Sequence, residues 1–175
     1  FSDISISEIV PPTAEIISNS NGTASVSGVA GNGVTVTVKF PDNTTATAVA
    51  GEIGVYGPIT SGLLQTSGNI VVTYVSSGNT SPEAIIQYTA LPVVSDQTFC
   101  ISGTVANLTA TGNLVKWYAT ASGGSVLATS TTLASGTYYV TQTVNGLESA
   151  RKSVLVTINN TTAPVASAQS LCGSV

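Results

Sequence analysis

Apolar and polar residues alternate along much of this chain, and the alternation predicts β-strands. Residues 34–40 read VTVTVKF, in which every second side chain is apolar. Because successive side chains of a strand point to opposite faces, this segment places one face in a core and the other toward solvent. The turn formers PDNT follow at 41–44, and the alternation resumes over 45–49, which predicts a hairpin. No stretch combines a helical period with capping residues.

Short segments of this kind, separated by Gly, Pro and Asn, continue through residues 11–91. We expect one strand on each side of Asn21-Gly22, one on each side of Gly78-Asn79, and another within residues 52–59. About seven short strands with turn signals between them are typical of an immunoglobulin-like β-sandwich.

The second half of the chain predicts further strands. They are expected in TVANLTATG (104–112), NLVKWYATASGG (113–124), SVLATSTTL (125–133), GTYYVTQTVNG (136–146) and LESARKSVLVTI (147–158). Asn145-Gly146 is the strongest hairpin signal of the chain. The sequence therefore predicts an all-β fold with two tandem immunoglobulin-like β-sandwich domains, at 11–91 and 92–160. We place their junction between Ala90 and Asp96, and an N-terminal extension at 1–10.

The end of the chain repeats the start of its second half. Residues 163–175, APVASAQSLCGSV, align with residues 91–103, LPVVSDQTFCISG, at a shift of 72 positions (164 − 92 = 72). The shift superposes Pro164 on Pro92 and Cys172 on Cys100, and three further positions between these two are identical. We therefore interpret residues 161–175 as the start of a further repeat. We expect residues 164–172 to be held by pairing with an exposed sheet edge, since unpaired edges accept added strands.

Strand alternation also assigns the aromatic residues to faces. Trp117 shares a face with Val115 and Ala119 and is predicted to lie in the core of the second domain. Tyr138 stands two residues before Val140, as does the tyrosine that fixes a corner in sandwich folds.

Tyr118 and Tyr139 fall on the opposite face, which we expect to be exposed. They are the candidate ligand-binding residues, as flat platforms for a sugar ring. The alternative interpretation is that they are ordinary tyrosines of a sheet face.

Composition excludes several functions. Only 7% of residues are charged, the net charge is −4 and there is no His. Nucleic-acid binding needs clustered Lys and Arg, which are lacking. Without His, a catalytic motif or a metal-ligand spacing, we expect no enzyme activity, no catalytic residue, no metal and no cofactor. No apolar run approaches the ~20 residues of a membrane span, so no membrane insertion is expected. The Thr- and Ser-rich, charge-poor surface favours an extracellular location.

An ordered set of motifs carries a family resemblance. TFC (98–100), NLTATG (107–112), KWY (116–118), ATASGG (119–124), GTYYV (136–140) and NGLES (145–149) follow one another. This series resembles an immunoglobulin-like repeat of giant cell-surface proteins of Bacteroidetes, and it is especially similar to the SprB-type repeats of gliding flavobacteria. Residues 11–91 look more loosely like a different, widespread bacterial immunoglobulin-like repeat.

The resemblance implies a function. It implies a structural repeat segment of a filamentous surface adhesin, involved in gliding motility and surface attachment, whose partners are neighbouring repeats and, through other parts of the protein, a surface polysaccharide or substratum. The alternative from another class is a carbohydrate-binding module of a secreted polysaccharide-degrading protein.

One departure from this repeat concerns Cys100. Relatives often carry a second Cys within the NGLES segment, where this chain has Leu147. We therefore expect Cys100 to be a buried core thiol that packs near Leu147, because unpaired Cys behaves as a small hydrophobic residue. A bridge between Cys100 and Cys172 is the other interpretation, although equivalent positions of stacked repeats lie far beyond the ~7 Å Cα separation of a disulfide.

Overall fold

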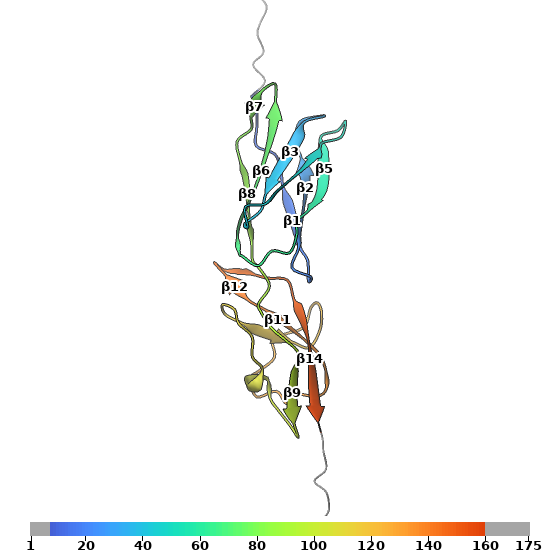
Figure 1. Cartoon of the computed structure of the whole chain (residues 1–175), viewed down its shortest axis with the longest axis vertical. Helices are drawn as coiled ribbons and strands as arrows, with labels where there is room; N and C mark the ends of the chain where they lie inside the picture. Colours follow the sequence, from blue (N-terminus) through green and yellow to red (C-terminus); the bar gives the residue numbers. More distant parts are fainter. Residues whose placement is uncertain (1–7, 160–175) are drawn as a thin grey trace, which may run out of the picture.

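The structure is a computed structural model that describes residues 8–159. These residues form fourteen β-strands and one 3-10 helix of three residues, so the predicted all-β class is confirmed. Two separate hydrophobic clusters define two lobes, which stand end to end along the long axis (Figure 1). We call residues 8–91 the first lobe and residues 92–159 the second lobe. The expectations for residues 1–7 and for the strand at 164–172 lie outside the described residues.

The first lobe consists of two sheets. Its strands are β1 (Glu15–Ser18), β2 (Ala24–Val29), β3 (Thr35–Lys39), β4 (Thr45–Val49), β5 (Val55–Thr60), β6 (Gly68–Ser76), β7 (Asn79–Thr80) and β8 (Ala84–Tyr88). One sheet has the order β1-β2-β5, and the other has the order β4-β3-β6-β7, with β8 also paired to β6.

The hairpins predicted from turn residues are confirmed. Strands β1 and β2 pair across the Asn21-Gly22 turn, and β3 pairs with β4 across residues 40–44. The turn between β6 and β7 lies at Ser77-Gly78, both with positive φ, one residue earlier than the sequence suggests. Such a pair of left-handed residues has the twist that a two-residue hairpin loop needs.

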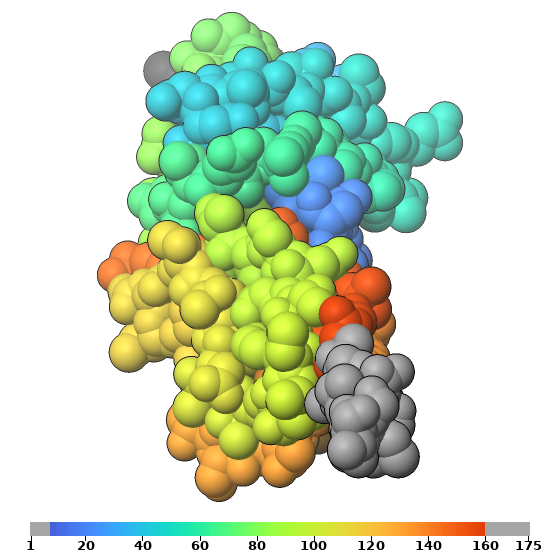
Figure 2. Space-filling view, turned by 60° about the horizontal axis from the view of Figure 1, so that its bottom comes forward, coloured from blue at the N-terminus to red at the C-terminus, as the bar shows by residue number. Residues whose placement is uncertain are grey.

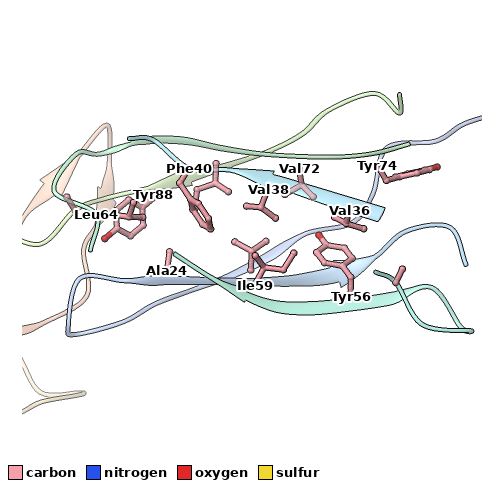
Figure 3. Packing of buried hydrophobic residues seen from close by; sticks show 14 residues of the cluster. Ala24, Val36, Val38, Phe40, Tyr56, Ile59, Leu64, Val72, Tyr74 and Tyr88 are labelled. Atoms are coloured by element: carbon pink, nitrogen blue, oxygen red, sulfur yellow. The ribbon is translucent and has the colours of Figure 1, made fainter. Parts of the chain in front are cut away.

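The two sheets of the first lobe enclose its core. Figure 3 shows Val36, Val38 and Val72 on one layer, facing Ala24 and Ile59 on the other. All five are buried. In β3 the valines of the alternating segment are therefore buried, and Thr35 and Thr37 face away from the core. Burial of such aliphatic side chains is the main favourable term in the folding of a small β-domain.

The second lobe has one main sheet. Its elements are β9 (Gln97–Cys100), η1 (Val105–Asn107), β10 (Lys116–Tyr118), β11 (Gly136–Thr141), β12 (Thr143–Val144), β13 (Leu147–Glu148) and β14 (Lys152–Asn159). The sheet has the order β10-β11-β14-β9, in which β14 and β9 run parallel. Strands β12 and β13 form the hairpin predicted at Asn145-Gly146, whose φ angles are 51° and 81°.

Two of the strands expected in the second lobe are absent as regular strands. Within TVANLTATG the chain forms η1, because the Asn107 side chain accepts a hydrogen bond from the Thr104 N–H at 2.8 Å and closes a turn. Residues 125–133 contain one isolated bridge, Thr104 to Thr132. Their backbone groups are still paired, with Val105 N donating to Thr131 O and Ala106 N to Thr129 O, both at 2.9 Å.

These irregular segments replace a second flat sheet. In Figure 2 the near face of the second lobe is covered by residues coloured yellow-green to yellow, among them the irregular segments on either side of β10. They close the cluster that contains Trp117, Leu108 and Leu133. The second lobe is therefore a sheet packed under an irregular layer that keeps its hydrogen bonds.

The lobes are joined by an extended segment. Strand β8 ends at Tyr88 and β9 begins at Gln97, and the residues between them belong to no strand. Val93 forms a single antiparallel bridge with Thr111, with hydrogen bonds of 2.9 and 2.8 Å in the two directions. The Pro92 side chain is fully buried.

Candidate functional site

The predicted structural aromatics lie where strand alternation places them. Trp117 is only 7% exposed and belongs to the second cluster with Val140 and Val154. Tyr138 packs against the same cluster, and its Oη accepts a hydrogen bond from the Ala134 N–H, four residues upstream, at 3.1 Å. This hydrogen bond to nearby upstream backbone is the geometry of a tyrosine corner.

The expected exposure of Tyr118 is wrong. Tyr118 points away from Trp117 as predicted, but it is only 6% exposed. The guanidinium carbon of Arg151 lies 3.6 Å from the centroid of its ring, and its hydroxyl donates to Glu148 Oε1 at 2.6 Å. A cation over the ring stabilises the pair and occupies the face that a sugar would need.

Tyr139 is the cross-strand partner of Tyr118. The register of β10 and β11 places the two directly opposite each other, and Tyr139 also faces Ser153 on β14. Its side chain is partly buried. The structure thus brings the two candidate tyrosines together, but only Tyr139 keeps a substantial exposed area.

Glu148 is the centre of a polar cluster that sequence reasoning missed. Its carboxylate accepts hydrogen bonds from Tyr118 Oη at 2.6 Å, Thr141 Oγ1 at 2.7 Å and Lys116 Nζ at 2.8 Å. The donors come from β10 and β11, so the cluster ties the β12–β13 hairpin to the main sheet. The only signal in the sequence is that Lys116 and Tyr118 share one face of their strand.

The cluster changes the protonation of its members. Burial alone would raise the pKa of Glu148, but the hydrogen bonds from Lys116, Tyr118 and Thr141 outweigh it and lower the pKa to about 2. The hydrogen bond to Glu148 raises the pKa of Lys116. Burial, and then the hydrogen bond to Glu148, raises the pKa of Tyr118. At neutral pH the carboxylate is therefore charged and both the ammonium and the phenol are protonated.

Replacing Glu148 by glutamine should weaken the second lobe. A lowered pKa in the folded state contributes stability that is present above the unfolded value near 4.5 and is lost as the pH falls toward about 2. Because 35% of the side chain faces solvent, which screens charge, we expect a loss of about 1 kcal/mol at pH 7. Urea unfolding of both proteins at pH 7 and at pH 2–4 measures it. The difference between them should shrink over that acid range, and a difference independent of pH would contradict the assignment.

The β12–β13 hairpin and the residue before it, Gln142, form hydrogen bonds with the segment between the lobes. Gln142 Nε2 donates to the Ala90 carbonyl oxygen at 2.8 Å, and Thr89 Oγ1 donates to the Leu147 carbonyl oxygen at 3.1 Å. We call these two hydrogen bonds the junction contact. Leu147 is the neighbour of Glu148 in β13, so the polar cluster positions one of the two acceptors. None of these residues was singled out from the sequence for this role.

The expected burial of Cys100 is also wrong. Cys100 is exposed on β9, where it is the register partner of Asn159. The burial pattern of β9 turns Phe99 toward the core and its neighbour Cys100 outward. The strand lies at the end of the second lobe away from the first lobe, whereas the β12 hairpin that contains Leu147 borders the first lobe (Figure 1). The Cys172 thiol lies outside the described residues.

Residues 8–159 also form several surface hollows. A surface hollow of about 520 Å³ opens between η1 and residues 126–129 and is lined mainly by apolar groups, including Leu108 and Trp117. A second, of about 340 Å³, lies between the lobes and is lined by Leu63, Leu91 and Lys152 among others. Among residues 8–159, no three His, Cys, Asp or Glu side chains gather in a way that could hold a metal ion. The same residues contain no helix of the length and apolarity that a membrane crossing requires.

The comparisons with known proteins concern the second lobe. A family model described as an Ig-like domain, CHU_C associated, matches residues 90–159. The match supports the immunoglobulin-like repeat family for this part of the chain, and its first residue, Ala90, is the residue whose carbonyl accepts the Gln142 hydrogen bond. Among curated proteins, no sequence has a significant match to the chain.

Proposed function

We propose that this chain is a structural repeat segment of a filamentous bacterial cell-surface adhesin, of the kind represented by the gliding-motility adhesin SprB. In this proposal residues 11–91 and 92–160 are two tandem immunoglobulin-like sandwich domains, located outside the cell and without catalytic activity. Their partners are neighbouring repeats of the same protein. Attachment to a polysaccharide or another substratum is made elsewhere in the adhesin.

The observation that carries the proposal is the fastening of the segment between the lobes. Over residues 89–93 the chain makes the junction contact through Thr89 and Ala90, buries Pro92 and bridges Val93 to Thr111. A module whose task is only to bind a ligand gains nothing from such a connection. A spacer that holds a distant adhesive site away from the cell needs it, because a stiff joint keeps the array extended.

The state of the candidate sugar platform supports the same conclusion. Arg151 covers the Tyr118 ring, and the Tyr118 hydroxyl is engaged by Glu148. A carbohydrate-binding module would instead present an open aromatic face with free polar groups beside it. Tyr139 alone is a small platform. The accessory-module alternative therefore has no observation in its favour.

A glycan array probed with the labelled chain tests the proposal. We expect no binding above background for the chain of residues 1–175. Reproducible binding to one class of sugar, reduced by Tyr139→Ala but not by the matched substitution Tyr74→Phe in the first lobe, would overturn it in favour of the carbohydrate-binding module. Tyr74 is a suitable control because it is nearly buried, 6% exposed, and its hydroxyl bonds to the backbone of Val10 at 2.9 Å.

A further inference from the structure

We propose that the junction contact is a general docking site carried by the second lobe, and that Thr161-Thr162 of this chain occupy the same site on a further copy of the repeat. The inference rests on the proposed repeat function and adds the chemistry by which consecutive repeats recognise each other. The occupant is a segment of this chain, and the partner is a second copy of the module at residues 90–159.

The docking site requires little from the preceding lobe. Gln142 binds the carbonyl oxygen of Ala90, which any residue would supply. The Leu147 carbonyl accepts from the hydroxyl of Thr89, the one side-chain donor that the preceding lobe contributes to the junction contact. The site therefore recognises a threonine followed by a residue that offers its backbone carbonyl oxygen.

The second lobe fixes the position of Gln142 by itself. Gln142 Oε1 accepts from the Asn113 N–H at 3.0 Å. Its own N–H donates to Ser149 Oγ at 3.1 Å, and its carbonyl accepts from the Ser149 N–H at 2.8 Å. Four hydrogen bonds, including that to Ala90, thus hold this one residue. The side chain is preorganised for an incoming carbonyl, which reduces the entropy lost on docking.

Gly112 makes room for this arrangement. A Cβ at Gly112 would lie 2.9 Å from Gln142 Oε1 and 3.2 Å from Pro92 Cβ. Both neighbours belong to the junction, and Gln142 Oε1 is held in place by the Asn113 N–H. Gly112→Ala would therefore push the amide away from Ala90, although it replaces no atom that takes part in the junction contact.

The body of the first lobe fits the junction loosely. A hollow of about 340 Å³ remains between the lobes, and its first-lobe wall includes the Gly22 turn and Leu63. Leu91 reaches toward the same turn, since its Cδ1 would lie 3.6 Å from a Cβ built on Gly22. Shape complementarity between the lobes is thus incomplete at this hollow, and the hydrogen bonds of residues 89–93 are the directional contacts at the junction.

The sequence repeats the required elements one period later. Thr161 corresponds to Thr89 (161 − 72 = 89), and Pro164 corresponds to the buried Pro92 (164 − 72 = 92). The two residues between them change, Ala90 to Thr162 and Leu91 to Ala163. Ala90 contributes only its backbone carbonyl oxygen to the junction contact, and the Leu91 side chain only lines the hollow. The side chains that the junction requires, Thr and Pro, are therefore identical one period later, and the two positions between them differ.

A chain extended by one copy tests the inference. Val175 corresponds to Gly103 (175 − 72 = 103), so adding residues 104–159 after Val175 completes a further module. Residual dipolar couplings report whether adjacent domains share one alignment tensor. We expect the last two domains to share a tensor, and we expect the same of the first two. Gln142→Ala or Gly112→Ala in the added copy should abolish the shared tensor, while Gln87→Ala, which removes an exposed side-chain bond to Asn69, should not.

A second experiment uses the chain without the added copy, in case the added copy does not fold. In the chain of residues 1–175, Leu91→Ala reproduces the residue found at 163 and should leave the two lobes coupled, whereas Thr89→Val should uncouple them. Separate tensors in the folded extended chain, or uncoupling by Leu91→Ala, would overturn the inference. Its failure is distinguishable from that of the proposed function, because separate tensors for the added copy alone, with the first two domains still coupled and no glycan bound, contradict only the docking of residues 161–162.

Discussion

Replacing Trp117 by alanine should lower the free energy of unfolding of the second lobe by about 3–5 kcal/mol, the usual cost of emptying a large aromatic site. Trp117 stands on β10, a strand of three residues, and packs in a cluster whose central members Val140 and Val154 are fully buried. The Leu127 N–H donates to its carbonyl at 2.8 Å, so the irregular layer is attached directly over this side chain.

Unfolding in urea, followed by far-UV circular dichroism, measures this loss, and the first lobe provides an internal reference. The matched control is Leu155→Ala on β14, in the same sheet, where the side chain is 50% exposed. We expect the control to change stability by about 0.5 kcal/mol or less, as surface substitutions usually do. A loss below about 1 kcal/mol for Trp117→Ala would show that the faces of β10 are assigned incorrectly.

The features that could be predicted from the sequence are those set by local chemistry. Asn145 and Gly146 both adopt positive φ, a conformation for which Asn and Gly are the preferred residues. These two residues alone therefore predict the hairpin. The burial of Trp117 and the corner hydrogen bond of Tyr138 follow from alternation along β10 and β11. Each of these predictions needs only residues that are neighbours in the chain.

The errors have a common physical origin. Alternation tells which side chains share a face, but it does not tell what covers that face. Tyr118 was expected to be exposed, and it is covered by Arg151 and Glu148, which stand about thirty positions away in the sequence. Cys100 was expected to be buried, but β9 turns Phe99 inward instead. The residues of the junction contact were missed for the same reason, since Gln142 and Ala90 meet only in the folded chain.

The second large effect is expected in the first lobe, at Gly28. This residue lies at a register irregularity between β2 and β5. A Cβ here would overlap the carbonyl oxygen of Thr13 and would lie 2.8 Å from the Tyr56 hydroxyl. The same oxygen accepts a hydrogen bond from Tyr56 Oη at 2.7 Å, and Thr13 also bonds to Val29 through its N–H and its side chain, both at 2.9 Å. Gly28 thus provides the space in which the segment at Thr13 is fastened to the sheet.

Gly28→Ala should therefore lower the stability of the first lobe by about 2–4 kcal/mol, from the strain of an overfilled site and the loss of about one net hydrogen bond. The small gain from a stiffer unfolded chain, about 0.4–1 kcal/mol, does not offset this. Gly62→Ala is the matched control, because a Cβ there meets no atom within 4 Å and the residue has no positive φ. Thermal unfolding of both variants should show a lower Tm for Gly28→Ala, together with faster amide exchange at Thr13 and Val29. Equal stability of the two variants would mean that the Thr13 segment contributes little to the fold.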